Sequence, residues 1–244
     1  MNVVNTQIAY ILHKRSYRET SSILEVLTKD YGRVSIMARG SRGALSRIAA
    51  SLLLFTPLVI SWQGRGSLPY LKSVERADLK APVLKNRALL SAMYVNELVM
   101  YLLHKDDVQE AVFEQYHHCL YALSDESSLE ITLRRFEIKL LETLGFGLNL
   151  HSEADTGAQI NTDLLYDYYL EHGVVQARES NHMASQPQIS GACLLALADE
   201  DYSLISENAD FLAELKRLMR FIINHHLGNK KLKSRELFRP VGQL

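Results

Sequence analysis

The sequence predicts an α+β protein, with a small β-barrel over residues 1–80 and a mostly α-helical domain over residues 81–244. Three observations support this fold class. The first 80 residues contain five short segments rich in β-branched residues. After Pro82 the hydrophobic pattern takes a helical period, and the net charge changes sign between the two regions.

The predicted strands are short and alternate partly between apolar and polar residues. They lie at residues 5–13, 21–28, 33–39, 52–62 and 68–75. Gly32 is suited to a tight turn, and residues 40–47 read as a polar, basic, flexible loop. Five strands with a long loop after the third match an OB-type barrel, which binds single-stranded nucleic acid. An SH3-like barrel has similar strand statistics, so both barrels stay open at this point.

The helical region contains several amphipathic segments. Helices are predicted near residues 89–102, 107–123, 129–144, 190–198 and 207–227. Residues 146–190 are irregular, with a weak hairpin near residues 166–177, and the tail after Gly228 is basic. In the last long helix, Lys216, Arg217 and Arg220 are expected on one face, away from the apolar stripe.

The formal net charge of −1 averages opposite regions. Residues 1–80 carry 12 Lys and Arg against five Asp and Glu, a net charge of +7. Residues 81–215 carry seven against 22, a net charge of −15, whereas residues 216–239 carry eight basic residues against Glu236 alone. This asymmetry suggests a basic surface for a polyanion and an acidic body with another role.

Basic and aromatic residues are interleaved in the barrel, as in proteins that bind single strands through a charged groove and stacking platforms. Phe55 and Trp62 lie in apolar strands and are expected in the core. The candidate DNA contacts are Arg33, Arg39, Arg42, Arg47, Arg65, Tyr17 and Tyr70, followed by Lys216, Arg217, Arg220, Lys231, Lys233 and Arg235. The alternative for the loop arginines is that they lie on the solvated surface without binding DNA.

Catalysis and metal binding find little support. The chain has no G-x-x-x-x-G-K-[ST] loop and no G-x-S-x-G elbow. Cys119 and Cys193 are 74 positions apart, and neither has the close second cysteine that a zinc site needs. We therefore expect no enzyme activity, no cofactor and no metal. The chain also has no run of about 18 apolar residues and no secretory signal, so a cytoplasmic protein without membrane contact is expected.

Several stretches, in this order over nearly the whole chain, resemble the RecO family. They are Arg18-Glu-Thr-Ser-Ser22, Tyr31-Gly-Arg33, Ala38-Arg-Gly40, Phe55-Thr-Pro-Leu58, Tyr94-Val-Asn-Glu-Leu98, Leu133-Arg-Arg-Phe-Glu137, Leu144-Gly-Phe-Gly147 and Leu232-Lys-Ser-Arg-Glu-Leu237. The resemblance implies an N-terminal OB domain and a C-terminal helical domain. It also implies a nucleoid-associated protein that binds single- and double-stranded DNA and anneals complementary strands. With RecR, such a protein loads RecA onto strands coated by single-strand-binding protein (SSB).

The resemblance carries two further implications. An arginine of the Arg-Arg-Phe-Glu stretch, Arg134 or Arg135, would bind the acidic, apolar C-terminal tail of SSB. From the residues alone, a salt bridge between Glu130 and Arg134 is the simpler interpretation. Many family members also hold a zinc ion through four cysteines after Leu-Gly-x-Gly. This chain has none there, which predicts a zinc-free variant.

Two other classes of function compete. A generic OB-fold protein that binds single-stranded nucleic acid, with a helical oligomerisation domain, explains the basic barrel equally well but predicts no SSB site. A metal-dependent nuclease would need clustered carboxylates, and those of the barrel region are scattered along the sequence.

Overall fold

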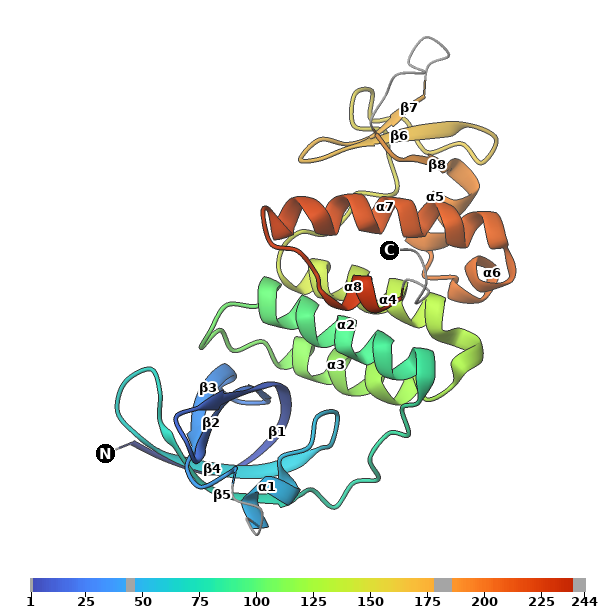
Figure 1. Cartoon of the computed structure of the whole chain (residues 1–244). Helices are drawn as coiled ribbons and strands as arrows, with labels where there is room; N and C mark the ends of the chain where they lie inside the picture. Colours follow the sequence, from blue (N-terminus) through green and yellow to red (C-terminus); the bar gives the residue numbers. More distant parts are fainter. Residues whose placement is uncertain (1, 43–46, 178–185, 239–244) are drawn as a thin grey trace. The chain divides into compact units, whose positions relative to one another are not determined.

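The computed structural model describes residues 2–42, 47–177 and 186–238 (Figure 1). By its internal contacts the chain divides into two compact units. One comprises Met1–Glu126 together with Lys231–Leu244, and the other comprises Ser127–Lys230. The second unit is therefore a continuous insertion in the sequence of the first. No helix in the described part is both long enough and apolar enough to cross a membrane.

The first unit contains a closed five-stranded barrel with the strand order β1-β2-β3-β5-β4. Its strands are β1 (Asn2–Tyr17), β2 (Ser21–Thr28), β3 (Gly32–Ala38), β4 (Leu58–Gly64) and β5 (Tyr70–Arg76). The long β1 closes the barrel, because its first half pairs with β4 and its second half with β2. A bulge at Thr6, which has a φ of 54°, lets the strand bend between its two partners.

The barrel core is filled by the inward-facing side chains of these strands. It includes Ala9, Ile11, Leu24, Val26, Val34, Ile36, Ala38, Leu52, Leu58, Ile60 and Trp62. Trp62 and Phe55 are 6% and 7% exposed, which confirms the expectation that both are core residues. The closed strand order supports the OB-type barrel.

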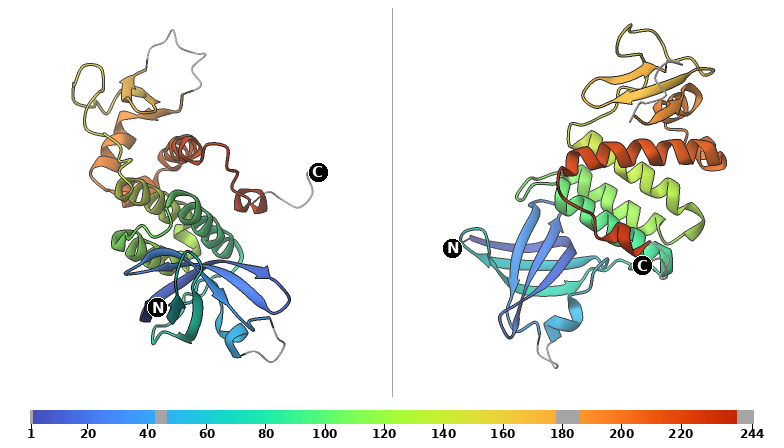
Figure 2. Two further views of the ribbon diagram at one scale, coloured as in Figure 1. Left: turned by 90° about the vertical axis from the view of Figure 1, so that its left-hand side faces the viewer. Right: turned by 45° about the horizontal axis from the view of Figure 1, so that its top comes forward.

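Three helices of the first unit accompany the barrel. They are α2 (Asn86–Leu102), α3 (Glu110–Ala122) and the short α8 (Ser234–Leu237), in addition to α1 (Arg47–Ser51) between β3 and β4. Asn96 on α2 donates from Nδ2 to the β1 carbonyl of Leu12 at 2.7 Å and accepts from the hydroxyl of Tyr116 on α3 at 2.7 Å. The helix α8 lies beside α2, although the two are far apart in sequence (Figures 1 and 2).

The second unit combines helices with a small antiparallel sheet. Its helices are α4 (Leu129–Thr143), α5 (Gly191–Ala198), α6 (Tyr202–Glu207) and α7 (Ala209–Leu227), and a 3-10 turn covers Glu126–Ser128 at its start. The sheet has the order β7-β6-β8, formed by β6 (Leu165–Tyr169), β7 (Gly173–Gln176) and β8 (Gln188–Ser190). Both α6 and α7 pack against α4.

The predicted fold class is confirmed, and the differences are local. The strand predicted over residues 52–62 begins only at Leu58, because Phe55 has a φ of 59° and Pro57 cannot donate to a ladder. The loop predicted over residues 40–47 lies partly outside the described residues, and Arg47 already begins α1. The elements β8, α6 and α8 were not predicted, because three to six residues are too few to show a period.

Candidate nucleic-acid interface

An arginine and a tyrosine meet where β3 approaches β5. Met37 of β3 pairs in parallel with Tyr70 of β5, and the Met37 N–H donates to the carbonyl of Pro69 at 2.8 Å. Two residues beyond Met37, the guanidinium of Arg39 lies 3.8 Å from the centroid of the Tyr70 ring. Tyr70 is 36% exposed. The pair therefore forms a cation–π contact at the surface of the barrel.

A second group forms where the loop after β3 meets the turn between β1 and β2. The Arg42 N–H donates to the Thr20 carbonyl at 3.2 Å, and Arg42 Nη1 donates to the Arg18 carbonyl at 2.8 Å. In the same turn, the Arg18 guanidinium lies 5.3 Å from the Tyr17 ring centroid. The structure thus brings Arg18 to Tyr17 and Arg42. The sequence prediction omitted Arg18, although its place directly after Tyr17 in a turn was a usable signal.

The strand register joins these two groups. Ser22 of β2 is paired with Ala38 of β3, the residue before Arg39, and Met37 is paired with Tyr70. The first residue of β5, Tyr70, is also paired with Gln63 of β4. The segments that carry Tyr17, Arg39 and Tyr70 therefore lie on adjoining strands of the barrel, about 5 Å apart from strand to strand.

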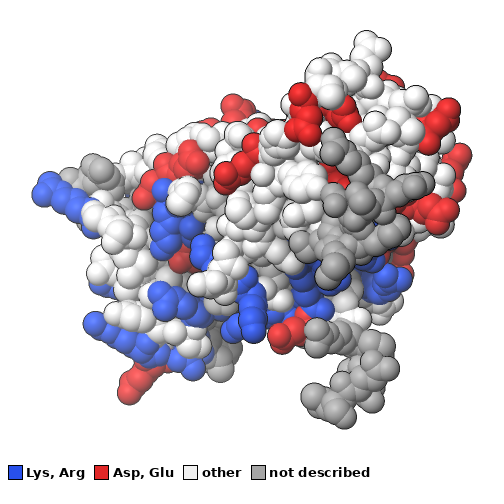
Figure 3. Space-filling view, turned by 90° about the horizontal axis from the view of Figure 1, so that it is seen from above, with Lys and Arg blue, Asp and Glu red and all other residues white. Residues whose placement is uncertain are grey.

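Other predicted barrel contacts are placed separately. Arg65 is exposed in the turn between β4 and β5, and Tyr70 is the first residue of β5 after this turn. Lys72, which the sequence prediction omitted, is exposed two residues after Tyr70 on β5. Figure 3 shows Lys and Arg side chains gathered in several groups on one face of the molecule, with some carboxylates beside them. Clusters of cationic side chains are expected on a surface that binds a polyanion.

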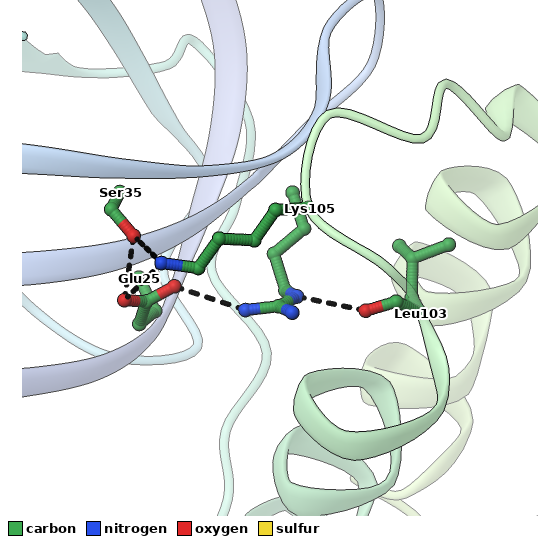
Figure 4. A network of polar contacts seen from close by, with 5 residues as sticks. Glu25, Ser35, Leu103 and Lys105 are labelled. Atoms are coloured by element: carbon green, nitrogen blue, oxygen red, sulfur yellow. Dashed lines mark hydrogen bonds and ion pairs between the residues drawn. The ribbon is translucent and has the colours of Figure 1, made fainter. Parts of the chain in front are cut away.

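Arg33 has a different environment from the other predicted arginines, because it contacts Glu25 and Leu103, which are labelled in Figure 4. Its side chain is 12% exposed, and Nη1 lies 3.0 Å from Glu25 Oε2. Arg33 Nε donates to the carbonyl of Leu103 at 3.0 Å. Glu25 Oε1 accepts from the hydroxyl of Ser35 at 2.7 Å, and Lys105 Nζ lies 3.4 Å from the same atom. This arrangement favours a structural role for Arg33, which fastens β3 to the loop between α2 and α3.

The cations predicted near the C-terminus fall into two sets. On α7, Lys216, Arg217 and Arg220 are exposed while Leu215, Leu218, Met219, Ile222 and Ile223 are buried, so the predicted separation of faces is confirmed. Lys216 Nζ lies 2.9 Å from Oε1 of Glu130 on α4. The second set, in the first unit, consists of the exposed Lys231 and Lys233 and the half-buried Arg235.

The two neighbouring arginines of α4 differ sharply. The Arg134 side chain is 7% exposed, and its Nη2 lies 2.7 Å from Oε1 of Glu137, whose side chain is fully buried. The Arg135 side chain is exposed, and its guanidinium lies 5.3 Å from the ring centroid of Tyr202 on α6. Nearby, a hydrogen bond from Lys139 holds the pKa of the Glu200 carboxyl below its usual range. Of the two, only Arg135 is placed to bind a ligand from solvent.

The residues do not fit the four-thiolate zinc site that the family resemblance implies. Both cysteines of the chain are buried as free thiols, and neither lies in residues 146–190. Burial raises the pKa of the Cys193 thiol to about 12, with a smaller contribution from Glu214. Within the described ranges, no group of three His, Cys, Asp or Glu side chains could hold a metal ion.

The comparisons with known proteins cover both parts of the chain. Residues 1–79 match the family model described as Recombination protein O N terminal, and residues 86–236 match the one described as Recombination protein O C terminal. The chain belongs to the RecO family. This confirms the resemblance drawn from the short sequence motifs.

The relatives in this family are similar over almost their whole length. The DNA repair protein RecO of Methylococcus capsulatus is 42% identical over 231 residues, which span 95% of this chain and 91% of the relative. That of Coxiella burnetii is 42% identical over 229 residues, or 94% and 95% of the two chains. That of Yersinia pestis is 38% identical over 234 residues, or 96% and 93%. The protein is thus a DNA repair protein of the RecO family.

Proposed function

We propose that this protein binds single- and double-stranded DNA and anneals complementary strands. With RecR, it would also help to load RecA onto single strands coated by SSB. The observation that carries the proposal is the grouping of exposed arginines with tyrosines on adjoining strands of the barrel. In this proposal residues 1–80 bind DNA together with the exposed cations of α7 and of residues 231–235, and the rest of residues 81–244 binds partner proteins. The protein works by binding, without a catalytic step or a cofactor, in the cytoplasm at the nucleoid.

The barrel surface supplies the two interactions that a single strand offers. Arg39 and Arg42 can neutralise phosphates, and binding should therefore weaken steeply as the salt concentration rises. Tyr70 offers a partly exposed ring for base stacking, and the guanidinium of Arg39 against that ring fixes its position. Because stacking tolerates any base, this surface would bind strands without strong sequence preference.

Annealing follows from charge neutralisation. Two complementary strands repel each other through their phosphates, and basic side chains that contact both strands reduce this repulsion. The chain has exposed cations on the barrel, on α7 and before α8, which give several places for backbone contacts. No step requires bond formation other than base pairing.

Recruitment to coated strands requires a contact with SSB, and Arg135 is the side chain best placed for it. An acidic, apolar peptide needs an exposed cation beside an apolar surface. The guanidinium of Arg135 lies 5.3 Å from the ring centroid of Tyr202 on α6, and this half-buried ring supplies apolar surface beside the cation. Binding of the SSB tail here would raise the local concentration of the protein at coated DNA.

The DNA-binding part is tested by replacing Tyr70 with Leu and measuring the fluorescence anisotropy of a labelled single-stranded oligonucleotide. Loss of a stacking ring should weaken binding about tenfold, which is about 1.4 kcal/mol. Tyr31→Leu is the matched control, because Tyr31 is also an exposed barrel tyrosine but contacts the ring of Trp62. Equal effects of the two variants would contradict the assignment of Tyr70.

The SSB part is tested by titrating a labelled peptide of the SSB C-terminal tail. Arg135→Ala should abolish measurable binding, whereas Arg217→Ala, an exposed arginine on α7, should leave it unchanged. If DNA binds but the peptide never does, the generic nucleic-acid-binding protein becomes the better description. If neither binds, the proposed function is wrong.

A further inference from the structure

A single carboxylate attaches the C-terminal basic segment to α2. Glu97 Oε1 accepts from the backbone N–H of Lys233 at 3.1 Å. Glu97 Oε2 accepts from the backbone N–H of Ser234 at 2.8 Å and from the Ser234 hydroxyl at 2.5 Å. These three contacts join residues 136 and 137 positions apart and lie within one compact unit. They satisfy N–H groups at the start of α8 that have no partner inside the helix.

Neighbouring side chains complete the attachment and orient the segment. Leu232 and Ser234 are 5% and 4% exposed, whereas Lys231 and Lys233 are exposed. The guanidinium of Arg235 lies 5.7 Å from the ring centroid of Tyr94, which is one helical turn before Glu97 on α2. The segment therefore alternates between buried residues that attach it and exposed lysines that point outward.

The segment has little means of keeping this conformation by itself. The helix α8 contains only four residues, and isolated helices of fewer than about 12 residues are marginal in water. Without the attachment, Lys231, Lys233 and Arg235 would belong to a flexible chain, and binding would have to order them.

We propose that Glu97 is a positioning residue for DNA binding. It holds residues 231–235 as a preformed strip of three cations that contacts the sugar-phosphate backbone. This inference rests on the proposed function, because it assumes that the protein binds DNA.

The sign of one mutational effect separates this proposal from simple electrostatics. Glu97→Ala removes a negative charge, and electrostatics alone would make DNA bind more tightly. The proposal gives the opposite result, because the cations lose their fixed arrangement. We expect the dissociation constant for a single-stranded oligonucleotide to rise about three- to tenfold, and Glu97→Gln, which keeps one acceptor oxygen, to fall between Glu97→Ala and wild type. The control Glu110→Gln removes a charge from α3 that pairs with Lys29, away from the strip.

The cations themselves are tested in a combined variant. Replacing Lys231, Lys233 and Arg235 together with Ala should lower the slope of log affinity against log salt by about 2, since each single-strand phosphate contact contributes about 0.7. Adding Glu97→Ala to that variant should not weaken affinity further, because the two changes remove the same interaction.

Trypsin cleavage measures the attachment of the segment directly, without DNA. Trypsin should cleave after Lys231 and Lys233 faster in Glu97→Ala than in wild type, while the thermal midpoint of the barrel stays unchanged. If Glu97→Ala fails to fold, Ser234→Ala removes one of the three hydrogen bonds and should shift affinity and cleavage in the same direction by less. Unchanged or tighter DNA binding by the folded Glu97 variants would overturn the inference. Failure of the wild-type protein to bind DNA at all would instead overturn the proposed function.

Discussion

Arg33 allows a sharp test of whether a basic residue of the barrel serves structure or DNA binding. The change is Arg33→Ala. It removes the guanidinium 3.0 Å from Glu25 Oε2 and leaves a carboxylate whose side chain is only 11% exposed. Removing one partner of a buried ion pair costs about 3–5 kcal/mol. Ser35 and Lys105 remain beside Glu25, so we expect a loss of about 3 kcal/mol, near the lower end of that range.

The assay is urea unfolding followed by the fluorescence of Trp62, which is the one tryptophan of the chain and lies in the barrel core. With a slope of about 2 kcal/mol per molar urea, the midpoint should fall by about 1.5 M. The double variant Arg33→Met with Glu25→Gln should recover much of the loss, because it removes both charges.

DNA binding by the folded Arg33→Ala protein tests the alternative, in which Arg33 contacts DNA. The structural assignment predicts wild-type affinity and an unchanged salt slope below the unfolding transition. An unchanged urea midpoint together with a weaker, less salt-dependent affinity would refute the reasoning and return Arg33 to the DNA-binding surface.

Three further predictions concern single residues. Gly32→Ala should strongly lower the urea midpoint of unfolding. Gly32 has a φ of 63°, and a Cβ there would lie 1.9 Å from the Asp107 carbonyl oxygen. A wild-type midpoint would contradict this prediction. Burial lowers the pKa of His226, so stability should be lost as the pH falls below about 6.5, where the unfolded imidazole takes up a proton. His226→Phe should flatten this dependence in pH-series unfolding. In a Cys119→Ser background, Cys193 of the folded protein should react with a thiol reagent at pH 8 far more slowly than Cys193 of the protein unfolded in urea. Burial raises the pKa of this thiol to about 12. Equal reaction rates would argue against its burial.

Much of the architecture could be predicted because its signals are local. The short apolar, β-branched runs of β2 and β3 and the helical period in α2, α4 and α7 each lie within one stretch of sequence. The attachment of α8 could not be predicted in this way. It depends on Glu97 and Ser234, which are 137 positions apart, and one sequence carries no signal that joins them.

The candidate site shows the same limit at the level of single residues. Arg33 and Arg39 bound the same predicted strand and have the same chemistry, yet one contacts a buried carboxylate and the other lies on a surface tyrosine. The carboxylate belongs to Glu25, eight positions before Arg33 on the neighbouring strand. Leu103 and Lys105, which complete the network, lie in a loop some 70 positions later. Composition could identify the barrel as basic, but only the tertiary contacts separate structural cations from those available to DNA.

For Arg134 and Arg135 a usable signal was present in the sequence. Arg134 shares its helical face with Ile138 and Leu141, at steps of four and three residues, and both are buried. Arg135 shares its face with Lys139 and the exposed Glu142. Periodicity alone therefore places Arg134 inward, where Glu137 rather than a ligand neutralises it. Truncating Arg134 would remove the cation 2.7 Å from Oε1 of the fully buried Glu137 and destabilise α4, so any loss of peptide binding in that variant would follow from unfolding. Arg135→Ala leaves that ion pair intact, and its effect on the SSB tail can be assigned to the contact itself.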